Sequence, residues 1–403
     1  MVGLMERRPR SRCIWLLAVT AVLLCVVGCA SASTPVPSAN SWRFVIFGDT
    51  RGDFDPALQP PCDMTTATGV SKALPQIAAK ITQLKPDFVL HVGDLVCGDL
   101  YHVAEAFHQI PPGSAIPYAR QFQAFKTAIR PITRAGIPFY CVRGNHEVSC
   151  GDGVNGPPDP DLAAAYYDAF GRHMPQNHPT QKGLTYSFRH KQVTVVAMDQ
   201  YMDLVPPLPE PVPWYRPGNP DWGSNFWGYH TVDQAWVRDQ LRAATTPFKI
   251  VMAHEPIFIA TGVPWGTPGE YQWSSELFFG PLQFNGPAVR QQFVDMLGGN
   301  GVQLYAAGHV HNMTVGSFTD TAGHVMYQLT AGNGGALPLN DKPEPPSPEA
   351  ALQDVHGQLH KLGFALVTVD PEANTALMEY YVTDLTGSRW WKARFTTTLT
   401  GAK

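Results

Sequence analysis

The sequence has little charge and no long basic segment. Charged residues make up 15% of its 403 residues, the formal net charge is −4, and no run of Lys or Arg occurs after the first dozen residues. Because binding to nucleic acid requires a basic patch or stripe, the sequence shows no nucleic-acid-binding signal. Internal repeats are also absent. The 37 Pro and 36 Gly indicate many turns, while a hydrophobic content of 44% is typical of a globular chain.

Long hydrophobic runs are missing as well, except near the N-terminus. Residues 14–27 are apolar and follow a cluster of arginines, but this stretch is too short to span a bilayer comfortably. Its form is that of an export signal. It ends in VVGC, which resembles the lipobox of bacterial lipoproteins and implies cleavage after residue 28 with a lipid on Cys29. An ordinary signal peptide, cut within residues 30–32, is the alternative.

The N-terminal segment sets the expected domain organisation. We expect residues 1–28 to be a lipoprotein signal peptide and residues 29–41, rich in Ser, Ala and Pro, to be a flexible tether. Residues 42–400 would then form one domain on the periplasmic or extracytoplasmic face of a membrane. The lipid would be its contact with that membrane.

Apolar β-branched runs alternate with helical patterns in the first half of the chain. This rhythm predicts a mixed sheet packed by helices, an α/β fold. Strands are expected at residues 44–47, 88–92, 139–142, 184–189, 193–198, 250–253, 303–306, 326–330, 364–369, 376–382 and 390–397. Helices are expected at residues 70–84, 120–134, 162–170, 231–244 and 289–298.

Five of the predicted strands are followed at once by a polar motif. In chain order the segments read RFVIFGDTR, DFVLHVGDL, PFYCVRGNHE, FKIVMAHEP and VQLYAAGHVHN, at 43–51, 87–95, 138–147, 248–256 and 302–312. Ligands of open α/β sheets bind at the carboxyl ends of the strands. The pooled Asp, Asn and His side chains form a ligand set for two divalent cations. Two cations can activate water and clamp phosphoryl oxygens, so a metal-dependent hydrolase is the first hypothesis.

The order and the residues of these motifs resemble those of the calcineurin-like metallophosphoesterase superfamily, which includes purple acid phosphatases. The resemblance implies a four-layer αββα sandwich of two mixed β-sheets flanked by helices. It also implies hydrolysis of a small phosphoester through a metal-bridging hydroxide. Phosphomonoesters are favoured over phosphodiesters, on the resemblance to acid phosphatases. The two ions would be divalent or trivalent, with Fe, Zn or Mn as candidates.

The resemblance assigns a role to each motif residue. Asp94 would bridge the two ions, and His146 would be a catalytic residue that contacts the phosphate and helps to protonate the leaving group. One ion would be bound by Asp49 and His311. The other would be bound by Asn145, His254 and His309.

Arg51 departs from the usual pattern of the family. Many members have His at this position, and a guanidinium cannot ligate a cation because it stays protonated. Arg51 is therefore expected either to bind phosphate through its two-donor fork or to pair with Asp53 or Asp99. Purple acid phosphatases lack this His too, and they place a Tyr where Cys97 stands in this chain.

Seven cysteines occur in the sequence, and an exported protein is free to form disulfides. Cys62, Cys97 and Cys150 all follow metal motifs, so their loops are expected to converge. A disulfide among them is the favoured prediction, and a thiolate ligand at Cys97 is the alternative. Cys141 is expected to be a buried thiol or to pair with Cys150.

Two insertions interrupt the pattern, at about 201–229 and 261–287. Both are dense in Pro and aromatic residues and suggest lids or binding loops, whose tryptophans would either wall a cleft for an aromatic phosphoester or only pack the loops. His91 is expected to be a core or supporting residue, and His356 and His360 to lie in a connector, on the surface or on the wall of a cleft. A phosphodiesterase or nucleotide-directed hydrolase of the same fold, and a non-catalytic metal-binding lipoprotein, are the alternative functions.

Overall fold

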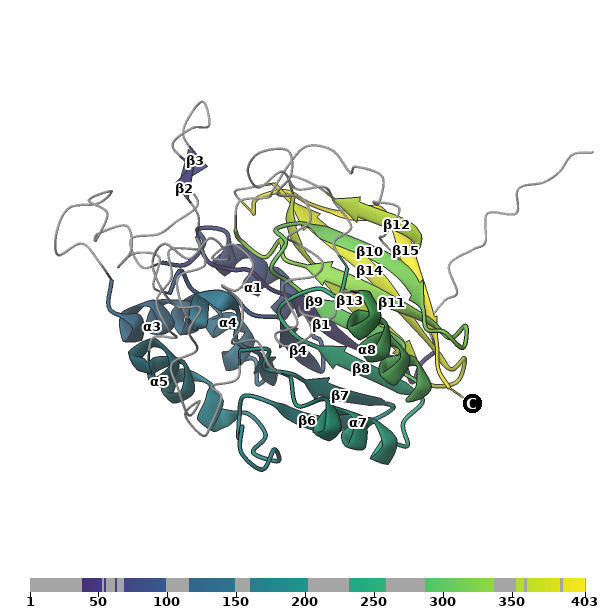
Figure 1. Ribbon diagram of the computed structural model, residues 1–403. Helices are drawn as coiled ribbons and strands as arrows, with labels where there is room; N and C mark the ends of the chain where they lie inside the picture. Colours follow the sequence, from purple (N-terminus) through teal and green to yellow (C-terminus); the bar gives the residue numbers. More distant parts are fainter. Residues whose placement is uncertain are drawn as a thin grey trace, which may run out of the picture. The chain divides into compact units, whose positions relative to one another are not determined.

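The strands that carry the polar motifs lie side by side in two β-sheets of the computed structural model (Figure 1). The structure describes residues 38–52, 69–98, 116–148, 160–201, 232–258, 287–336, 361–384 and 387–402, together with the backbone of 54–55, 62–63 and 353–358. The predicted signal peptide, Cys29, Cys150 and His360 lie outside these ranges, and so do residues 202–229 and 261–286 of the two insertions and the Cys62 side chain. Within the described part of the chain, no helix has the length and apolar character needed to cross a membrane.

The first sheet has six strands and contains the first three motif strands. These strands are parallel neighbours, because the central one pairs with both of the others. Three antiparallel strands from the end of the chain extend the sheet on one side. In spatial order the strands are β15 (Trp390–Thr400), β14 (Thr375–Thr383), β13 (Leu362–Asp370), β1 (Trp42–Phe47), β4 (Phe88–His91) and β5 (Phe139–Cys141).

The second sheet has seven strands and contains the other two motif strands, which are again parallel neighbours. In spatial order its strands are β12 (Gln353–Gln358), β10 (Met313–Thr319), β11 (Val325–Ala331), β9 (Leu304–Ala307), β8 (Phe248–Met252), β7 (Val193–Ala197) and β6 (Tyr186–His190). The run from β11 to β7 is parallel, and the edge strands are antiparallel. A separate two-stranded ribbon joins β2 (Phe54–Asp55) to β3 (Cys62–Asp63).

Helices cover the outer side of each sheet (Figure 1). One group of helices packs on the first sheet: α1 (Leu74–Leu84), α3 (Tyr118–Ala128), α4 (Arg130–Arg134) and α5 (Pro160–Ala169). The second sheet is covered by α7 (Gln234–Ala243) and α8 (Pro287–Gly299). Two short 3₁₀ helices, η1 (Asn145–Glu147) and η2 (Gly171–His173), complete the described elements. This arrangement confirms the predicted sandwich of two mixed sheets with flanking helices.

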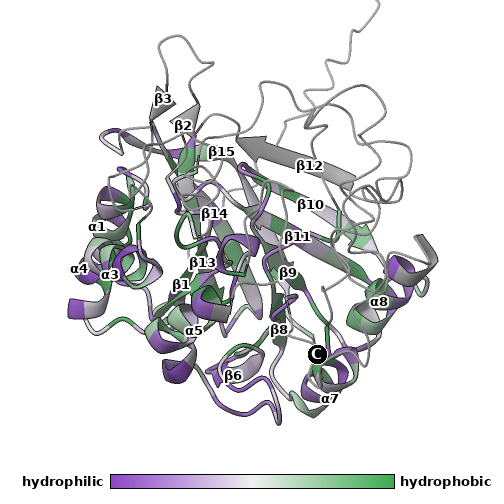
Figure 2. Cartoon of the chain, turned by 60° about the vertical axis from the view of Figure 1, so that its left-hand side comes forward, coloured by the Kyte–Doolittle hydropathy of each residue, from purple (hydrophilic) through white to green (hydrophobic). Residues whose placement is uncertain are grey.

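The core forms two clusters because the parallel strands are apolar on both faces, as parallel strands in α/β folds usually are. In β7, Val195 belongs to the cluster between the two sheets, whereas Val196 belongs to the cluster under α7 and α8. Ile250 and Val251 divide in the same way in β8. Figure 2 shows apolar strands in the interior and hydrophilic residues on the outer sides of the helices.

Several predicted boundaries shift for physical reasons. The first helix begins at Leu74 rather than at residue 70, because Val70 forms a β-bridge with Arg51. The predicted helix 120–134 is interrupted at Ile129, just before Pro131, whose missing N–H cannot continue the helical ladder. Residues 353–358 form β12 beside β10, so His356 lies on a strand and not in a connector.

The chain is anchored to the first sheet before the predicted domain boundary at residue 42. Ser38 donates from its backbone N–H and its hydroxyl to the two carboxylate oxygens of Asp370, at 2.8 and 2.9 Å. Asn40 donates to Glu372 at 2.7 Å. Residues 38–41, the end of the predicted tether, are therefore attached to the end of β13 and the turn that follows it.

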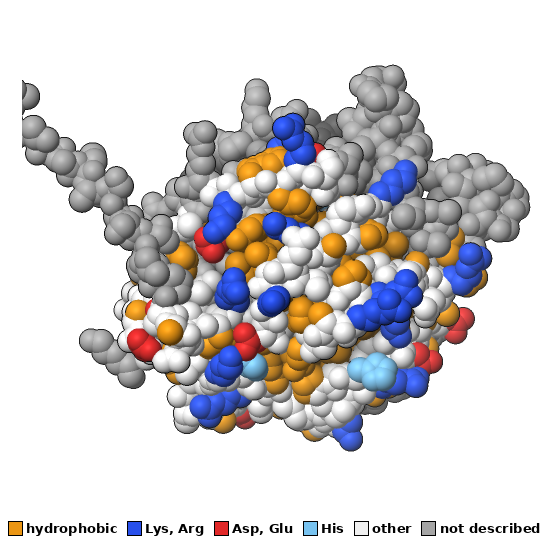
Figure 3. Space-filling model, turned by 180° about the vertical axis from the view of Figure 1, so that it is seen from behind, with side chains coloured by type: hydrophobic (Ala, Val, Ile, Leu, Met, Phe, Trp, Pro, Cys, Tyr) orange, Lys and Arg blue, Asp and Glu red, His pale blue; other side chains and the backbone are white. Residues whose placement is uncertain are grey.

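Figure 3 shows that Lys and Arg side chains on the rear face are spread among apolar and neutral groups.

The aromatic cluster around Phe88 generates a test of the core. Its ring stacks on Phe44 with the centroids 4.8 Å apart, and it meets Phe188 edge-on. Phe88→Ala would leave a cavity between the sheets, so the free energy of unfolding should fall by about 3–5 kcal/mol in chemical denaturation. Val325→Ala, at a site that is 56% exposed, is the control and should change it by less than about 0.5 kcal/mol. Equal effects would contradict the assigned core.

Candidate metal centre

The six predicted metal ligands come from five strand ends and meet at the junction of the two sheets. Parallel strands in one sheet end at the same edge, so each sheet presents its ligands together. A direct contact joins the two groups, because the backbone N–H of His309 after β9 donates to both carboxylate oxygens of Asp49 after β1, at 2.9 and 3.0 Å. The first sheet supplies Asp49, Asp94 and Asn145, and the second supplies His254, His309 and His311.

Four of these ligands converge on one point, which we call the inner site. Asn145 Oδ1 lies 3.0 Å from His254 Nε2 and 3.1 Å from His309 Nδ1. The two imidazole nitrogens are 3.3 Å apart, and Asp94 Oδ1 is also 3.3 Å from His254 Nε2. Ligands held about 2.0–2.2 Å from one tetrahedral ion have separations of this size. The inner site therefore fits a cation bound by Asp94, Asn145, His254 and His309.

The tautomer of His254 supports this fit. Its Nδ1 lies 2.8 Å from the carbonyl oxygen of Val92, and a carbonyl only accepts, so Nδ1 carries the proton. In the neutral ring, Nε2 then directs its lone pair at the oxygens of Asn145 and Asp94. A lone pair facing two oxygens is stable when a cation lies between them. A backbone carbonyl on the far ring nitrogen is also the usual support for a metal-binding His.

The remaining ligands form a second group, which we call the outer site. One ligand atom each from Asp49, Asp94 and His311 lies within 4.8 Å of the others, and all three residues are buried. Burial and the neighbouring carboxylate of Asp94 raise the pKa of Asp49, since two negative charges in an apolar setting repel each other. A cation between the carboxylates would relieve that repulsion. The outer site thus fits a cation chemically, with Asp94 shared between the two sites.

Arg51 lies against the outer site and is itself 8% exposed. One of its terminal guanidinium nitrogens is 3.0 Å from His311 Nε2, and its Nε is 3.3 Å from Asp94 Oδ2. The predicted alternatives for this side chain, Asp53 and Asp99, lie outside the described residues. The contacts within the described part of the chain place the guanidinium on the metal ligands.

His146 contacts the ligand cluster without joining either group. Its backbone N–H donates to Asp94 Oδ1 at 3.1 Å, and its ring Nδ1 donates to the carbonyl oxygen of Cys97 at 3.0 Å. The other ring nitrogen is 3.8 Å from Asp94 Oδ2. Burial and the nearby Arg51 cation lower the pKa of His146 to about 4. The ring is held by one nitrogen and directs the other toward Asp94; its catalytic role stays a prediction.

Glycines let the ligand loops approach one another closely. A Cβ on Gly144 would overlap the carboxylate of Asp94, and a Cβ on Gly308 would overlap the carboxylate of Asp49. The ligands Asp49, Asp94 and His309 themselves have positive φ, at 54°, 55° and 67°. Residues other than glycine rarely adopt this conformation, and such strain is typical of functional sites.

Glu147 is a supporting residue to which the sequence reasoning assigned no role. Its Oε1 accepts the N–H groups of Leu95 and Val96, at 2.8 and 3.1 Å. Its Oε2 accepts those of Asp94 and Gly144, at 3.0 and 2.8 Å. One buried carboxylate thus ties the Asp94 loop to the Asn145 loop. The signal for it was present, since the Glu of GNHE stands three residues after Gly144, the spacing of a helix-capping box.

A buried ion pair fixes the Asn145 loop to the second sheet. Arg143 donates to Asp199 Oδ2 from Nε at 3.0 Å, and a second guanidinium nitrogen donates to the carbonyl oxygen of Tyr201 at 2.8 Å. Both charged side chains are almost fully buried. The Tyr201 hydroxyl donates in turn to Glu255, next to His254, at 2.5 Å. These contacts position ligand loops of both sheets relative to each other.

His91 and the cysteines complete the predicted residues. His91 is a fully buried supporting residue, as expected, with its Nε2 3.0 Å from the Thr50 hydroxyl. The sulfur of Cys97 lies 2.8 Å from the carbonyl oxygen of Gly52. The side chains of its predicted partners, Cys62 and Cys150, lie outside the described residues, so the disulfide stays a prediction. Cys141 is a buried thiol beside the Tyr166 hydroxyl, as predicted.

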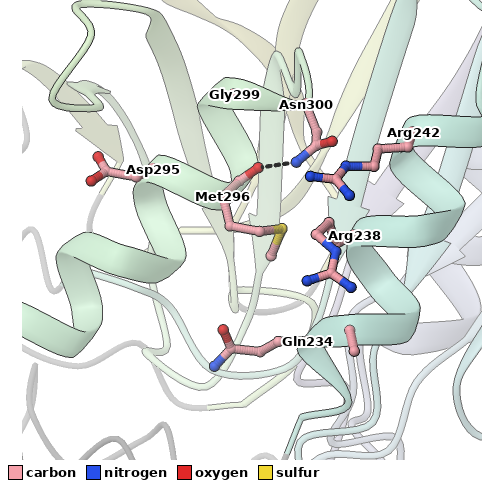
Figure 4. A pocket seen from close by; sticks show the side chains of 8 residues that line it. Gln234, Arg238, Arg242, Asp295, Met296, Gly299 and Asn300 are labelled. Atoms are coloured by element: carbon pink, nitrogen blue, oxygen red, sulfur yellow. Dashed lines mark hydrogen bonds between the residues drawn. The ribbon is translucent and has the colours of Figure 1, made fainter.

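A separate cavity lies between α7 and α8 (Figure 4). Its volume is about 530 Å³, and its lining includes Arg238, Arg242 and Asn300. None of the metal-ligand residues lines it. Asn300 uses its amide to donate to the carbonyl oxygen of Met296 at 2.6 Å. This cavity is therefore distinct from the metal centre.

The fold and the site define a class of protein, namely an α/β sandwich with a buried Asp/Asn/His metal centre at the junction of two sheets. The sequence model of the calcineurin-like phosphoesterase family matches residues 43–313, which include every predicted ligand. The chain belongs to this family. The family is typically dependent on two metal ions.

Solved structures show the same fold at low sequence identity. A purple acid phosphatase from yellow lupin (Lupinus luteus) seeds has a TM-score of 0.55 and 18% identity, over 90% of this chain and 55% of that chain. PhoD also has a TM-score of 0.55, with 16% identity over 92% of this chain and 73% of that chain. This chain thus spans about half the length of the lupin protein. No curated protein matches the sequence.

The four contacts of Glu147 generate a test of the ligand loops. Glu147→Gln keeps the shape of the side chain, but whichever oxygen becomes an amide group loses two bonds and faces two N–H donors. We expect the free energy of unfolding to fall by about 3 kcal/mol, because two buried N–H donors lose their acceptor, with a parallel loss of bound metal. Glu379→Gln, whose partner is the exposed Lys392, should cost less than about 1 kcal/mol. A stable variant with full metal content would contradict the role of Glu147.

Proposed function

We propose that this protein is a metal-dependent phosphoric ester hydrolase and that phosphomonoesters are its main substrates. The observation that carries the proposal is the convergence of Asn145 Oδ1, His254 Nε2 and His309 Nδ1 within 3.3 Å of one another beside Asp94. Membership of the calcineurin-like phosphoesterase family supports it. The preference for monoesters rests on the resemblance to acid phosphatases.

The side chains of this chain would hold and orient the reacting groups. The inner site would bind one cation through Asp94, Asn145, His254 and His309, and the outer site would bind another through Asp49, Asp94 and His311. When bound, the ions supply Lewis-acid activation of water and neutralisation of phosphoryl charge. The buried setting strengthens this effect, because electrostatic interactions are stronger where water is excluded.

His146 would act on the leaving group. Its Nδ1 is fixed as a donor by the carbonyl oxygen of Cys97, so Nε2 is the nitrogen that would take a proton before giving it to the leaving group. The backbone N–H of the same residue orients the Asp94 carboxylate. Ring and backbone of one residue therefore couple the proton donor to the shared ligand.

The place of action is a second part of the proposal. The arginine-rich start, the short apolar stretch and the VVGC sequence support export as a lipoprotein with the lipid on Cys29. The domain would then act on small phosphoesters outside the cytoplasm while attached to a membrane. Labelling with a radioactive fatty acid should mark the wild-type chain, and Cys29→Ser should remove the label.

Removal of one inner-site ligand generates the main test of the function. Asn145→Ala and His309→Ala should each lower kcat for a chromogenic aryl phosphate by at least about 100-fold, because each leaves the cation and the phosphoryl group without a fixed partner. The assay is run with Mn, Zn and Fe in turn, on the aryl monophosphate and on the bis(aryl) diester. The ratio of the two rates assigns the substrate class.

Matched variants away from the site are the controls. Asn300→Ala changes an amide between α7 and α8, and His324→Ala changes a His whose side chain is 60% exposed. Both should keep the wild-type rate, and all four variants should keep the wild-type circular dichroism spectrum. Failure of the wild type to hydrolyse either ester with any of the three metals would refute the enzyme assignment. It would leave a metal-binding protein.

A further inference from the structure

We propose that Arg51 makes the two cation sites unequal, so that the inner site loads first and the outer site loads only when the guanidinium leaves its ligands. This inference rests on the two-cation centre of the proposed function. It concerns what this chain does at the position where many family members have a metal-binding His. Arg51 would be a positioning residue for the metal centre, whose occupancy it sets.

The first argument is competition for one nitrogen. His311 directs Nε2 to the guanidinium of Arg51 at 3.0 Å. The same nitrogen is the outer-site ligand, because it is also the one that faces Asp49, at 3.8 Å. An imidazole nitrogen has a single lone pair, so it cannot accept from Arg51 and ligate a cation at once. Binding at the outer site therefore requires Arg51 to release His311.

The second argument is charge. Arg51 also places Nε 3.3 Å from Asp94 Oδ2, so it already neutralises part of the shared carboxylate. The guanidinium is permanently protonated, and only 10% of its side chain is exposed, so water screens it weakly. A second cation entering beside it meets a repulsion that a neutral His at this position would not create.

The inner site shows a different set of contacts. Its ligand atoms on Asn145, His254 and His309 lie 3.0–3.3 Å from one another. The far nitrogen of His254 is held by a backbone carbonyl. These contacts leave the inner ligands arranged for a cation before one arrives. The first equivalent should consequently bind there without displacing a side chain.

Metal binding measures this inequality directly. The purified chain is stripped with a chelator and dialysed against increasing Zn²⁺ or Co²⁺ at fixed pH, and bound metal is counted by elemental analysis. The wild type should bind one equivalent and then a second at least tenfold more weakly. Arg51→Ala and Arg51→His should each tighten the second equivalent by at least tenfold, with the His variant tightest because it adds a ligand.

Ligand variants assign each step to a site. His311→Ala should lose the weak equivalent and keep the tight one, whereas His309→Ala should lose the tight one. Arg238→Ala removes an arginine on α7 whose side chain is 40% exposed and should bind metal as the wild type does, which controls for the loss of one positive charge. If Arg51→Ala fails to fold, Arg51→Gln provides the same test with a longer neutral side chain.

The outcomes separate this inference from the proposed function. Two equal equivalents in the wild type, or no tightening in the Arg51 variants, would overturn the role of Arg51 even if phosphoesters are hydrolysed. Loss of the tight equivalent in His311→Ala would overturn the order of loading. Stepwise binding that responds to Arg51 in a protein without hydrolytic activity would support this inference and refute the enzyme assignment.

Discussion

The buried carboxylate of Asp94 is the group on which the rest of the centre depends. An isolated carboxylate in a protein interior carries a large desolvation cost, and here several partners offset it. The backbone of His146 donates to one oxygen, while Arg51 lies against the other. Burial alone would raise the pKa of Asp94, but electrostatic interactions with His254, His146 and Arg51 outweigh burial and lower that pKa. The loop that carries this residue therefore has one stable position.

A small number of buried polar contacts connect the Asp94 loop to ligand loops of both sheets. Glu147 ties the Asp94 loop to the Asn145 loop within the first sheet. Arg143 and Asp199 then connect the first sheet to the second, and breaking such a buried pair typically costs about 3–5 kcal/mol. The N–H of His309 adds a direct link to Asp49. The ligand geometry is thus set by loop contacts that span the sandwich, while the apolar core sets the distance between its sheets.

Much of the site could be predicted from the sequence because its residues follow strands. An apolar β-branched run with a polar residue at its end indicates both a buried strand and the edge where that strand opens. Parallel neighbours then bring such ends together. The same reasoning did not find Glu147, because its role depends on which backbone N–H groups face the side chain.

The β-rich end of the chain also contains strands that the sequence predicted and strands that it did not. The strands near residues 364–369 and 376–382 were visible as apolar runs, but β10 and β12 were not. Polar and small residues interrupt those two segments, and they become strands because a neighbour pairs with their backbone. Pairing between distant segments contributes hydrogen bonds that no local pattern displays. Strand assignment there required the completed sheet.

Sequence alone determined the order of the motifs and indicated a mixed sheet packed by helices, because spacing and residue type are local properties; the layered sandwich and the six candidate ligands came from the resemblance to a known family. The tertiary structure decided how those ligands divide into an inner and an outer group. It also decided that Arg51 lies on His311 and Asp94, where the sequence had left a phosphate contact or a pairing with Asp53 or Asp99. The physical reason is that a side chain's partner depends on which loops from two sheets arrive within about 3 Å of it, and the linear chain does not specify that.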